Sequence, residues 1–146
     1  MADANRHALV VAISDYQDEQ LRRLAAPVND AKAFAKALAD PSIGNFTIGP
    51  AVINKSASDV LETMEGWLRE RLPTDLVVVY FSGHGLKDDG GNLYLAARNT
   101  TTNRLLSTGI ADSVLRALLS ACRAKQQVLI LDCCFGNLGS GVLPAN

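Results

Sequence analysis

The chain has 146 residues, of which 48% are hydrophobic and 20% are charged, and its formal net charge is −1. This length and composition predict one globular domain over residues 1–146 and exclude an intrinsically disordered chain. The near-neutral charge, without a basic run, argues against nucleic acid or an anionic membrane as the partner. No apolar stretch approaches the roughly 20 residues that would span a bilayer.

Four apolar segments predict strands, the second of them weakly. The first, third and fourth are unbroken apolar runs, which is typical of strands that are covered on both faces. The segments between them have the periodicity of helices, so strands and helices alternate along the chain. This order predicts an α/β fold with a mainly parallel sheet and, because crossovers are right-handed, helices on both faces. The strands are expected at residues 7–14, 46–53, 76–81 and 128–131.

Capping residues and apolar stripes predict the three helices between these strands. The expected caps are Asn29 or Asp30 for the first helix, Ser56 with Asp59 for the second, and Ser107 or Thr108 for the third. The third helix is expected to present Ile110, Val114, Leu118 and Cys122 on one face. After the fourth strand, the glycine-rich residues 136–146 predict a loop, and a short hairpin is expected near residues 93–96.

The cysteines and the N-terminus bear on location and on metals. The N-terminal residues show no basic region followed by an apolar core and a cleavage site, so they predict no secretion signal. The three cysteines are Cys122, Cys133 and Cys134, and an odd count without a secretion signal favours the reducing cytoplasm. No His/Cys set has zinc spacing, so we expect neither a metal nor a cofactor.

The third and fourth predicted strands both stop at reactive side chains. His84 follows one strand within the sequence SGHG (82–85), and Cys134 follows the other within DCCF (132–135). The carboxyl ends of parallel strands meet at one edge of a sheet, where ligands bind, and neighbouring strands lie about 5 Å apart. If the two strands are neighbours, His84 and Cys134 are therefore expected to share one substrate.

A cysteine and a histidine at this edge would support acyl transfer. A free thiol has a pKa of about 8.5, so a nearby imidazole is needed to take its proton or to protonate the leaving amine. The backbone N–H groups of Gly85 and Cys134 could stabilise the oxyanion. Other interpretations stay open, because His84 alone could be a loop histidine and the glycines could be turn residues. Cys122 and Cys133 are expected to serve packing.

At these residues the chain resembles a caspase-type cysteine peptidase of the metacaspase and bacterial caspase-like branch. This family carries SGHG at the end of one strand and Asp-x-Cys at the end of another, about 50 residues later, as here. Residues 28–31 and 92–95 are also similar to the family, so the resemblance covers nearly the whole chain. It implies a caspase-like three-layer sandwich.

The resemblance also implies roles for individual residues. Cys134 would be the nucleophile, His84 the acid and base, and the N–H groups of Gly85 and Cys134 the oxyanion hole. Asp30 and Asp132 match two acidic residues that line the primary specificity pocket of metacaspases. Two carboxylates would select Arg or Lys before the scissile bond. Alternatively, Asp30 caps its helix and Asp132 bonds to loop amides.

The chain departs from the family in three places. Gly136 and Asn137 replace the usual Ser-Gly after the nucleophile, and Ala111-Asp112 replaces a pair of aspartates that binds calcium in some metacaspases, so calcium is not supported. The sequence ends at Asn146, where caspase-like folds continue into a small subunit. We therefore expect this chain to be the large-subunit portion, with the small subunit of the same protein as its partner.

Three functions follow from these features. The first is an Arg/Lys-directed endopeptidase, activated by another protease or by a receptor module, and the resemblance implies a stress, cell-death or defence pathway. The second is a non-catalytic scaffold that recruits a partner. The third, a nucleotide-binding domain, is disfavoured because the loop SDYQDEQ after the first strand is acidic and lacks phosphate-binding glycines.

Overall fold

A parallel sheet forms the centre of the protein. The computed structural model describes residues 5–133 and 135–137. The strand order is β2-β1-β4-β8, and β3 pairs with β1 beyond β2, with every pairing parallel. This arrangement confirms the predicted α/β class and its mainly parallel sheet. The strands are β1 (Arg6–Ala12), β2 (Thr47–Ile48), β3 (Val52–Ile53), β4 (Leu76–Ser82) and β8 (Gln126–Asp132).

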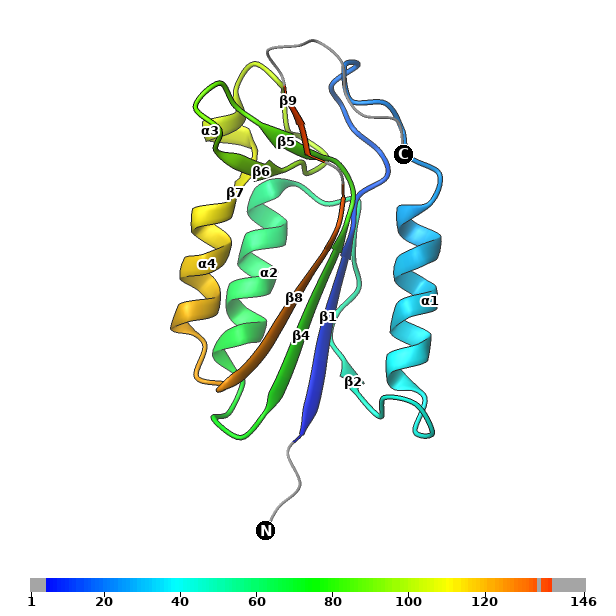
Figure 1. Ribbon diagram of the computed structural model, residues 1–146. Coiled ribbons are helices and arrows are strands. Elements are labelled where there is room, and N and C mark those ends of the chain that lie inside the picture. Colours follow the sequence, from blue (N-terminus) through cyan, green and yellow to red (C-terminus); the bar gives the residue numbers. More distant parts are fainter. Residues whose placement is uncertain (1–4, 134, 138–146) are drawn as a thin grey trace.

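Helices cover both faces of this sheet, as Figure 1 shows. Helix α1 (Pro27–Ala39) lies on one face, and α2 (Ala57–Arg69) and α4 (Asp112–Ala121) lie on the other. Successive side chains of a strand point to opposite faces. In β1, Val10 therefore packs toward α1, whereas Leu9 and Val11 join the core with α2. Burial on both faces explains why this strand is apolar without alternation. Within the described residues, no helix has the length and apolar character needed to cross a membrane.

A second, smaller sheet lies beyond the carboxyl ends of the main strands (Figure 1). Its order is β7-β6-β5-β9, and β5 and β6 form the hairpin that the sequence predicts near residues 93–96. The predicted loop at 136–146 is wrong at its start, because residues 136 and 137 belong to β9, which pairs in parallel with β5. Residues 138–146 lie outside the described part of the chain. The four strands are β5 (Gly85–Lys87), β6 (Leu93–Leu95), β7 (Ile110–Ala111) and β9 (Phe135–Asn137).

The first helix begins earlier than its sequence predicts. Neither Asn29 nor Asp30 is its cap, because α1 begins at Pro27 and its N-cap is Ala26, which makes no side-chain capping bond. Proline suits this position, since its fixed φ matches a helix and its missing N–H would have no partner in the first turn. Asp30 thus lies inside the first turn, where the helix dipole favours a carboxylate. The predicted cap of α2 is confirmed, because Ser56 accepts a hydrogen bond from the N–H of Asp59.

The predicted third helix is wrong in its start and, at Val114, in its buried face, although Ile110, Leu118 and Cys122 do pack in or against the core. A single-turn helix, α3 (Leu105–Thr108), precedes strand β7, and only then does α4 begin at Asp112. Pairing of β7 with β6 interrupts the helical pattern. Leu115 is consequently the buried residue of α4, while Val114 is 40% exposed.

The predicted second strand is also divided. Within residues 46–53, β2 and β3 are separated by residues 49–51, and Pro50 among them has no N–H to donate to a sheet.

Candidate active site

The strands that carry the two predicted catalytic residues are neighbours. Strands β4 and β8 pair in parallel along their whole length, and their last residues, Ser82 and Asp132, are partners. Their continuations meet again in the second sheet, where Gly85 of β5 is the partner of Phe135 of β9. The residue after His84 therefore pairs with the residue after Cys134. Cys134 itself lies outside the described residues, so its role as nucleophile stays a prediction.

His84 is buried and its ring is held by a backbone carbonyl. The residue is 4% exposed, and its Nε2 lies 2.9 Å from the carbonyl oxygen of Arg22. A carbonyl oxygen only accepts hydrogen bonds, so Nε2 must carry the hydrogen and donate it. In the neutral imidazole, Nδ1 is then the basic nitrogen. The backbone of a loop 62 positions away thus selects the tautomer of His84.

Burial lowers the pKa of His84 below its ordinary value near 6.5. The Arg22 carbonyl opposes this shift by binding the N–H, and the positive charge of Arg22 adds to it. Since burial disfavours the charged form, the imidazole is neutral at pH 7. His84 can therefore accept a proton at Nδ1, and its conjugate acid would readily give that proton up.

Tyr16 fixes the main chain of His84. The backbone N–H of His84 donates to Tyr16 Oη at 2.9 Å, and the Tyr16 hydroxyl donates to the carbonyl of Ile13 at 2.9 Å. The phenol ring also lies against the imidazole, with ring centroids 4.9 Å apart and planes at 53°. Burial raises the pKa of Tyr16, so the hydroxyl remains a donor at every working pH. The end of β1 thereby holds the loop after β4.

Gly83 makes room for this bridge. A Cβ at Gly83 would lie 2.9 Å from Tyr16 Oη and 3.1 Å from the carbonyl oxygen of Ile13. Any larger residue would displace the tyrosine that bonds to His84, which gives the glycine before the histidine a steric reason. Gly85, the next glycine, is buried at the start of β5. Its N–H stays the predicted oxyanion donor.

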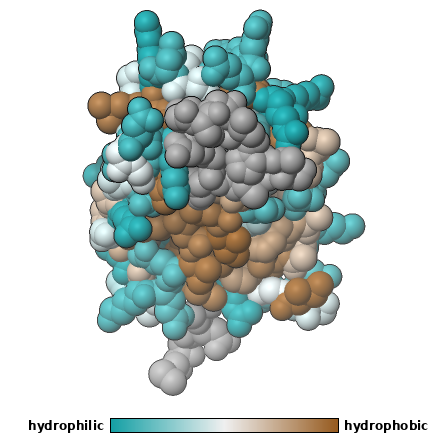
Figure 2. All heavy atoms as spheres, turned by 45° about the horizontal axis from the view of Figure 1, so that its top comes forward, coloured by the Kyte–Doolittle hydropathy of each residue, from teal (hydrophilic) through white to brown (hydrophobic). Residues whose placement is uncertain are grey.

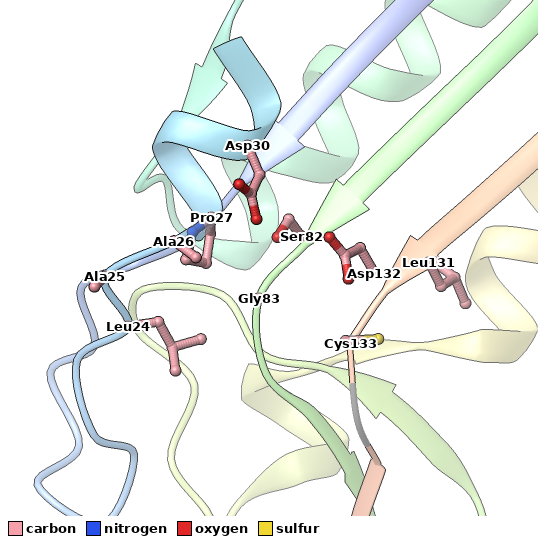
Figure 3. Close-up of a pocket in the computed structure, with 10 residues that line it drawn as sticks. All are labelled: Leu24, Ala25, Ala26, Pro27, Asp30, Ser82, Gly83, Leu131, Asp132 and Cys133. Carbon is pink, nitrogen blue, oxygen red and sulfur yellow. The ribbon is translucent and has the colours of Figure 1, made fainter. Parts of the chain in front are cut away.

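A cavity of about 490 Å³ opens between the N-terminal turn of α1 and the ends of β4 and β8 (Figure 3). The structure brings Asp30 and Asp132 together in its wall, and Figure 3 shows both carboxylates directed toward the space around Ser82. No lysine or arginine is among the lining residues of the described chain. They are Leu24, Ala25, Ala26, Pro27, Asp30, Ser82, Gly83, Leu131, Asp132 and Cys133.

The alternative role of Asp30 is wrong, and that of Asp132 finds no support among the described residues. Asp30 is not the cap of α1, and its carboxylate makes no hydrogen bond to another described residue. Asp132 does not bond to loop amides within the described chain; its Oδ2 accepts a hydrogen bond from Tyr80 Oη at 2.9 Å. With respect to residues 5–133 and 135–137, both carboxylates therefore keep oxygen atoms for a ligand in the cavity. Their role in substrate selection stays a prediction.

The other two cysteines pack against the core. Cys133 packs against the main hydrophobic core and also lines the cavity, and in Figure 3 its sulfur is directed away from the aspartates. Cys122 is buried at the end of α4, with its thiol 3.5 Å from the carbonyl oxygen of Leu68. Within residues 5–133 and 135–137, no group of three or more His, Cys, Asp or Glu side chains could hold a metal. The expectation that the protein needs no cofactor or calcium remains a prediction.

Three contributors to the site were missed by sequence reasoning. They are the main-chain carbonyl of Arg22, the hydroxyl of Tyr16 and the hydroxyl of Tyr80. A carbonyl leaves no signal in the sequence, because every residue has one. The two tyrosines lie at or near the ends of apolar strands, and a buried phenol needs a hydrogen-bond partner. The need of a buried phenol for a hydrogen-bond partner was the sequence signal that could have pointed to Tyr16 and Tyr80.

The fold and this edge of the sheet define a class of protein in which a histidine and a cysteine follow neighbouring parallel strands. A model of the caspase domain family matches residues 5–146, so the chain belongs to this cysteine peptidase family. The crystal structure of caspase-1 from Spodoptera frugiperda has the same fold, with a TM-score of 0.70 at 12% sequence identity. The match covers 90% of this chain and 48% of that one, so this chain spans about half the length of its structural relative. Among curated protein sequences, none shows significant similarity to the chain.

Proposed function

We propose that this chain is the large-subunit portion of a cysteine endopeptidase of the metacaspase and bacterial caspase-like branch that cleaves after Arg or Lys. The observation that carries the proposal is the cavity containing both Asp30 and Asp132, next to the loop that holds His84. A guanidinium or ammonium group would bind two carboxylates through charge-assisted hydrogen bonds. Animal caspases that cleave after Asp need arginines in this pocket, and its described lining has none.

The reaction follows from the arrangement of His84. Its Nδ1 takes the proton of the Cys134 thiol, and the thiolate attacks the carbonyl carbon of the scissile bond. The N–H groups of Gly85 and Cys134 stabilise the oxyanion. As the C–N bond breaks, the imidazolium returns its proton to the leaving amine, and water then hydrolyses the thioester. The lowered pKa of His84 favours this second transfer, since it makes the imidazolium a stronger acid.

A small subunit of the same protein is the proposed partner. In the described sheet, β8 has a neighbour on only one side, β4, and Val128 on β8 is 45% exposed. Figure 2 turns the top of the molecule toward the reader, and hydrophobic residues gather in the middle of the face that it shows. An apolar strand with one open edge is a ready site for a further strand. The protease would be activated by another protease or by a receptor module, without a cofactor, in a cytoplasmic stress, cell-death or defence pathway.

A peptide library tests the proposal. The assembled protease, containing both subunits, is expected to cleave after Arg or Lys, and Cys134→Ala is expected to abolish cleavage. Cys122→Ala is the matched control, because this cysteine is buried in the core with residues of α2 and does not line the cavity. A preference for Asp before the scissile bond would refute the assignment of the two aspartates. Full cleavage by Cys134→Ala would refute the catalytic role and favour a non-catalytic scaffold.

A further inference from the structure

Tyr80 lies behind the cavity, in a position fixed by packing. It is a residue of β4, it is 6% exposed, and it belongs to the core between the sheet and α1. Its ring stacks on Phe34 of α1, with centroids 4.5 Å apart and planes at 23°. The phenol is therefore held between two rigid elements, and its hydroxyl has little freedom to move. Tyr80 is not among the residues that line the cavity.

The hydroxyl of Tyr80 reaches the neighbouring strand and donates to Oδ2 of Asp132 at 2.9 Å. The register partner of Tyr80 on β8 is Ile130, two residues before Asp132, so both side chains lie on the same face of the sheet. Burial raises the pKa of Tyr80 to about 12, and its hydrogen bond to Asp132 adds to the shift. Tyr80 consequently stays a hydrogen-bond donor throughout the range in which a peptidase works.

This bond determines what Asp132 can offer a ligand. With Oδ2 bound to Tyr80, the carboxylate cannot rotate freely, and Oδ1 has no hydrogen bond to another described residue. A guanidinium is a planar fork whose donors need acceptors at fixed positions, whereas an ammonium is a compact charge with rotatable donors. An Asp132 carboxylate that is held in one orientation, in the same cavity wall as Asp30, therefore favours a guanidinium group over an ammonium group.

We propose that Tyr80 is a positioning residue that sets specificity, because its hydroxyl orients Asp132 so that the cavity prefers Arg to Lys. This inference rests on the proposed Arg/Lys-directed function and adds to it a residue that does not touch the substrate. Tyr80→Phe keeps the ring and its stacking on Phe34 and removes only the hydroxyl. The substitution leaves both carboxylates in place but lets Asp132 turn.

The test compares matched peptides that carry Arg, Lys or the neutral isostere citrulline before the scissile bond, cleaved by the assembled protease. Tyr80→Phe should lower kcat/KM for the Arg peptide about tenfold, as expected for losing one hydrogen bond to a charged group. The loss should appear mainly in KM and should be several times smaller for Lys, so the Arg-to-Lys ratio falls. Cleavage of the citrulline peptide should not change. Tyr94→Phe is the control, since Tyr94 is an equally buried tyrosine in β6 of the second sheet.

Two further variants separate positioning from general damage. If Tyr80 acts through Asp132, then Tyr80→Phe should have no further effect on the Arg-to-Lys ratio in an Asp132→Asn background. Phe34→Leu, which loosens the ring but keeps the hydroxyl, should shift the ratio in the same direction by a smaller factor. Phe34→Leu also covers the case in which Tyr80→Phe fails to fold, and an unchanged Arg-to-Lys ratio in that variant would then refute the role of Tyr80.

Two outcomes would overturn the inference, and they are distinguishable. If the wild-type protease prefers Arg but folded Tyr80→Phe keeps the same Arg-to-Lys ratio, the role of Tyr80 is refuted and the proposed function stands. If the wild-type protease cleaves the citrulline peptide and the Arg peptide with equal kcat/KM, the proposed specificity is refuted, and the role of Tyr80 is refuted with it.

Discussion

The two ends of the parallel sheet hold buried polar groups that are connected in different ways. At the amino end, Asp75 accepts a hydrogen bond from the N–H of Leu72 at 2.7 Å, and Arg71 donates to the carbonyl of Trp67 at 3.1 Å. These two hydrogen bonds join residues three and four positions apart, and the contact of His7 with Asp75, which spans more positions, is weaker, with Nε2 of His7 3.9 Å from Oδ2 of Asp75. At the carboxyl end, the bonds of His84 to Arg22 and Tyr16, and that of Tyr80 to Asp132, span 62, 68 and 52 positions.

The sequence separation of these hydrogen bonds distinguishes a structural cluster at the amino end from a candidate active site at the carboxyl end. The local hydrogen bonds close the turn between α2 and β4. Long-range bonds exist only in the assembled fold, and they fix groups from several elements relative to one another, as a catalytic site requires. Substitutions at the amino end should therefore lower stability, whereas those at the carboxyl end should lower activity beyond their effect on stability.

The largest expected effect is on activity, from Gly83→Ala. The new Cβ would lie 2.9 Å from Tyr16 Oη, so the bridge from Ile13 to the N–H of His84 must shift. A displacement of a catalytic group by about 1 Å can cost roughly 100-fold in rate, and we expect a loss of that size in kcat/KM. Steady-state cleavage of an Arg peptide, corrected for the folded fraction, measures it.

Gly49→Ala provides the matched control. Its Cβ would lie 2.5 Å from Trp67 Nε1, a clash at least as severe but directed at the core beside α2. Overpacking of this kind costs about 1–3 kcal/mol of stability, and the folded enzyme should keep its kcat/KM. The separation of the two ends would be wrong if Gly49→Ala lowered activity per folded molecule as much as Gly83→Ala.

The next largest effect is on stability, from Asp75→Ala at the amino end. The substitution leaves the N–H of Leu72 without its acceptor and removes a carboxylate that is 2% exposed. We expect a loss of about 2 kcal/mol in the free energy of unfolding, measured by urea denaturation, with unchanged KM. Asp75→Asn, which keeps an acceptor oxygen, should lose less. An Asp75→Ala variant with altered substrate preference would contradict a purely structural role.

The same contrast explains what the sequence predicts and what it does not. The α/β order and the parallel sheet follow from apolar runs and crossover rules, which depend on local pattern. The adjacency of the strands before His84 and Cys134 was a condition that the sequence left open, and the pairing of β4 with β8 meets it. Helix α2 follows from Ser56 and Asp59, whose capping bond is also local. The third helix fails because strand β7 forms only by pairing with β6, a contact that no local pattern encodes.

The candidate site divides in the same way. Its reactive residues are visible in the sequence because His84 and Cys134 follow the ends of apolar strands, whereas the pocket roles of Asp30 and Asp132 come only from the family resemblance. The groups that hold them are not visible, because the Arg22 carbonyl and the Tyr80 hydroxyl act across more than 50 positions. The reactive residues of a site are thus easier to predict from a sequence than the groups that orient those residues.

The two histidines give a smaller effect that compares the ends directly. Burial lowers the pKa of His84 at the carboxyl end and of His7 at the amino end; the charge of Arg71 adds to the shift of His7, and Asp75 opposes it. Near pH 6.5 the unfolded chain binds protons that the folded imidazoles resist. Stability should therefore be full above this pH and should fall as the pH decreases through it.

Urea denaturation at pH 7.5 and 5.5 measures this loss, in a range where ordinary carboxylates stay ionised. His84→Gln should remove more of the pH dependence than His7→Gln, because His84 is the more buried residue and His7 has a partner in Asp75 at 3.9 Å. A wild-type protein that became more stable at pH 5.5 would contradict the lowered pKa of both histidines.

The smallest expected effect comes from a glycine that belongs to neither end. Gly66 is exposed in the interior of α2, and a Cβ there would meet no atom within 4 Å. Gly66→Ala should raise the free energy of unfolding by about 0.5–1 kcal/mol, because alanine loses less backbone entropy in a helix. Gly91→Ala is the control, since its Cβ would also be in open space but its φ of +82° disfavours alanine, so stability should fall. Both variants should keep the kcat/KM and the Arg preference of the wild type. If Gly66→Ala stabilised the protein and also changed its activity, stability and activity would be coupled across the sheet, and the division between a structural amino end and a functional carboxyl end would not hold.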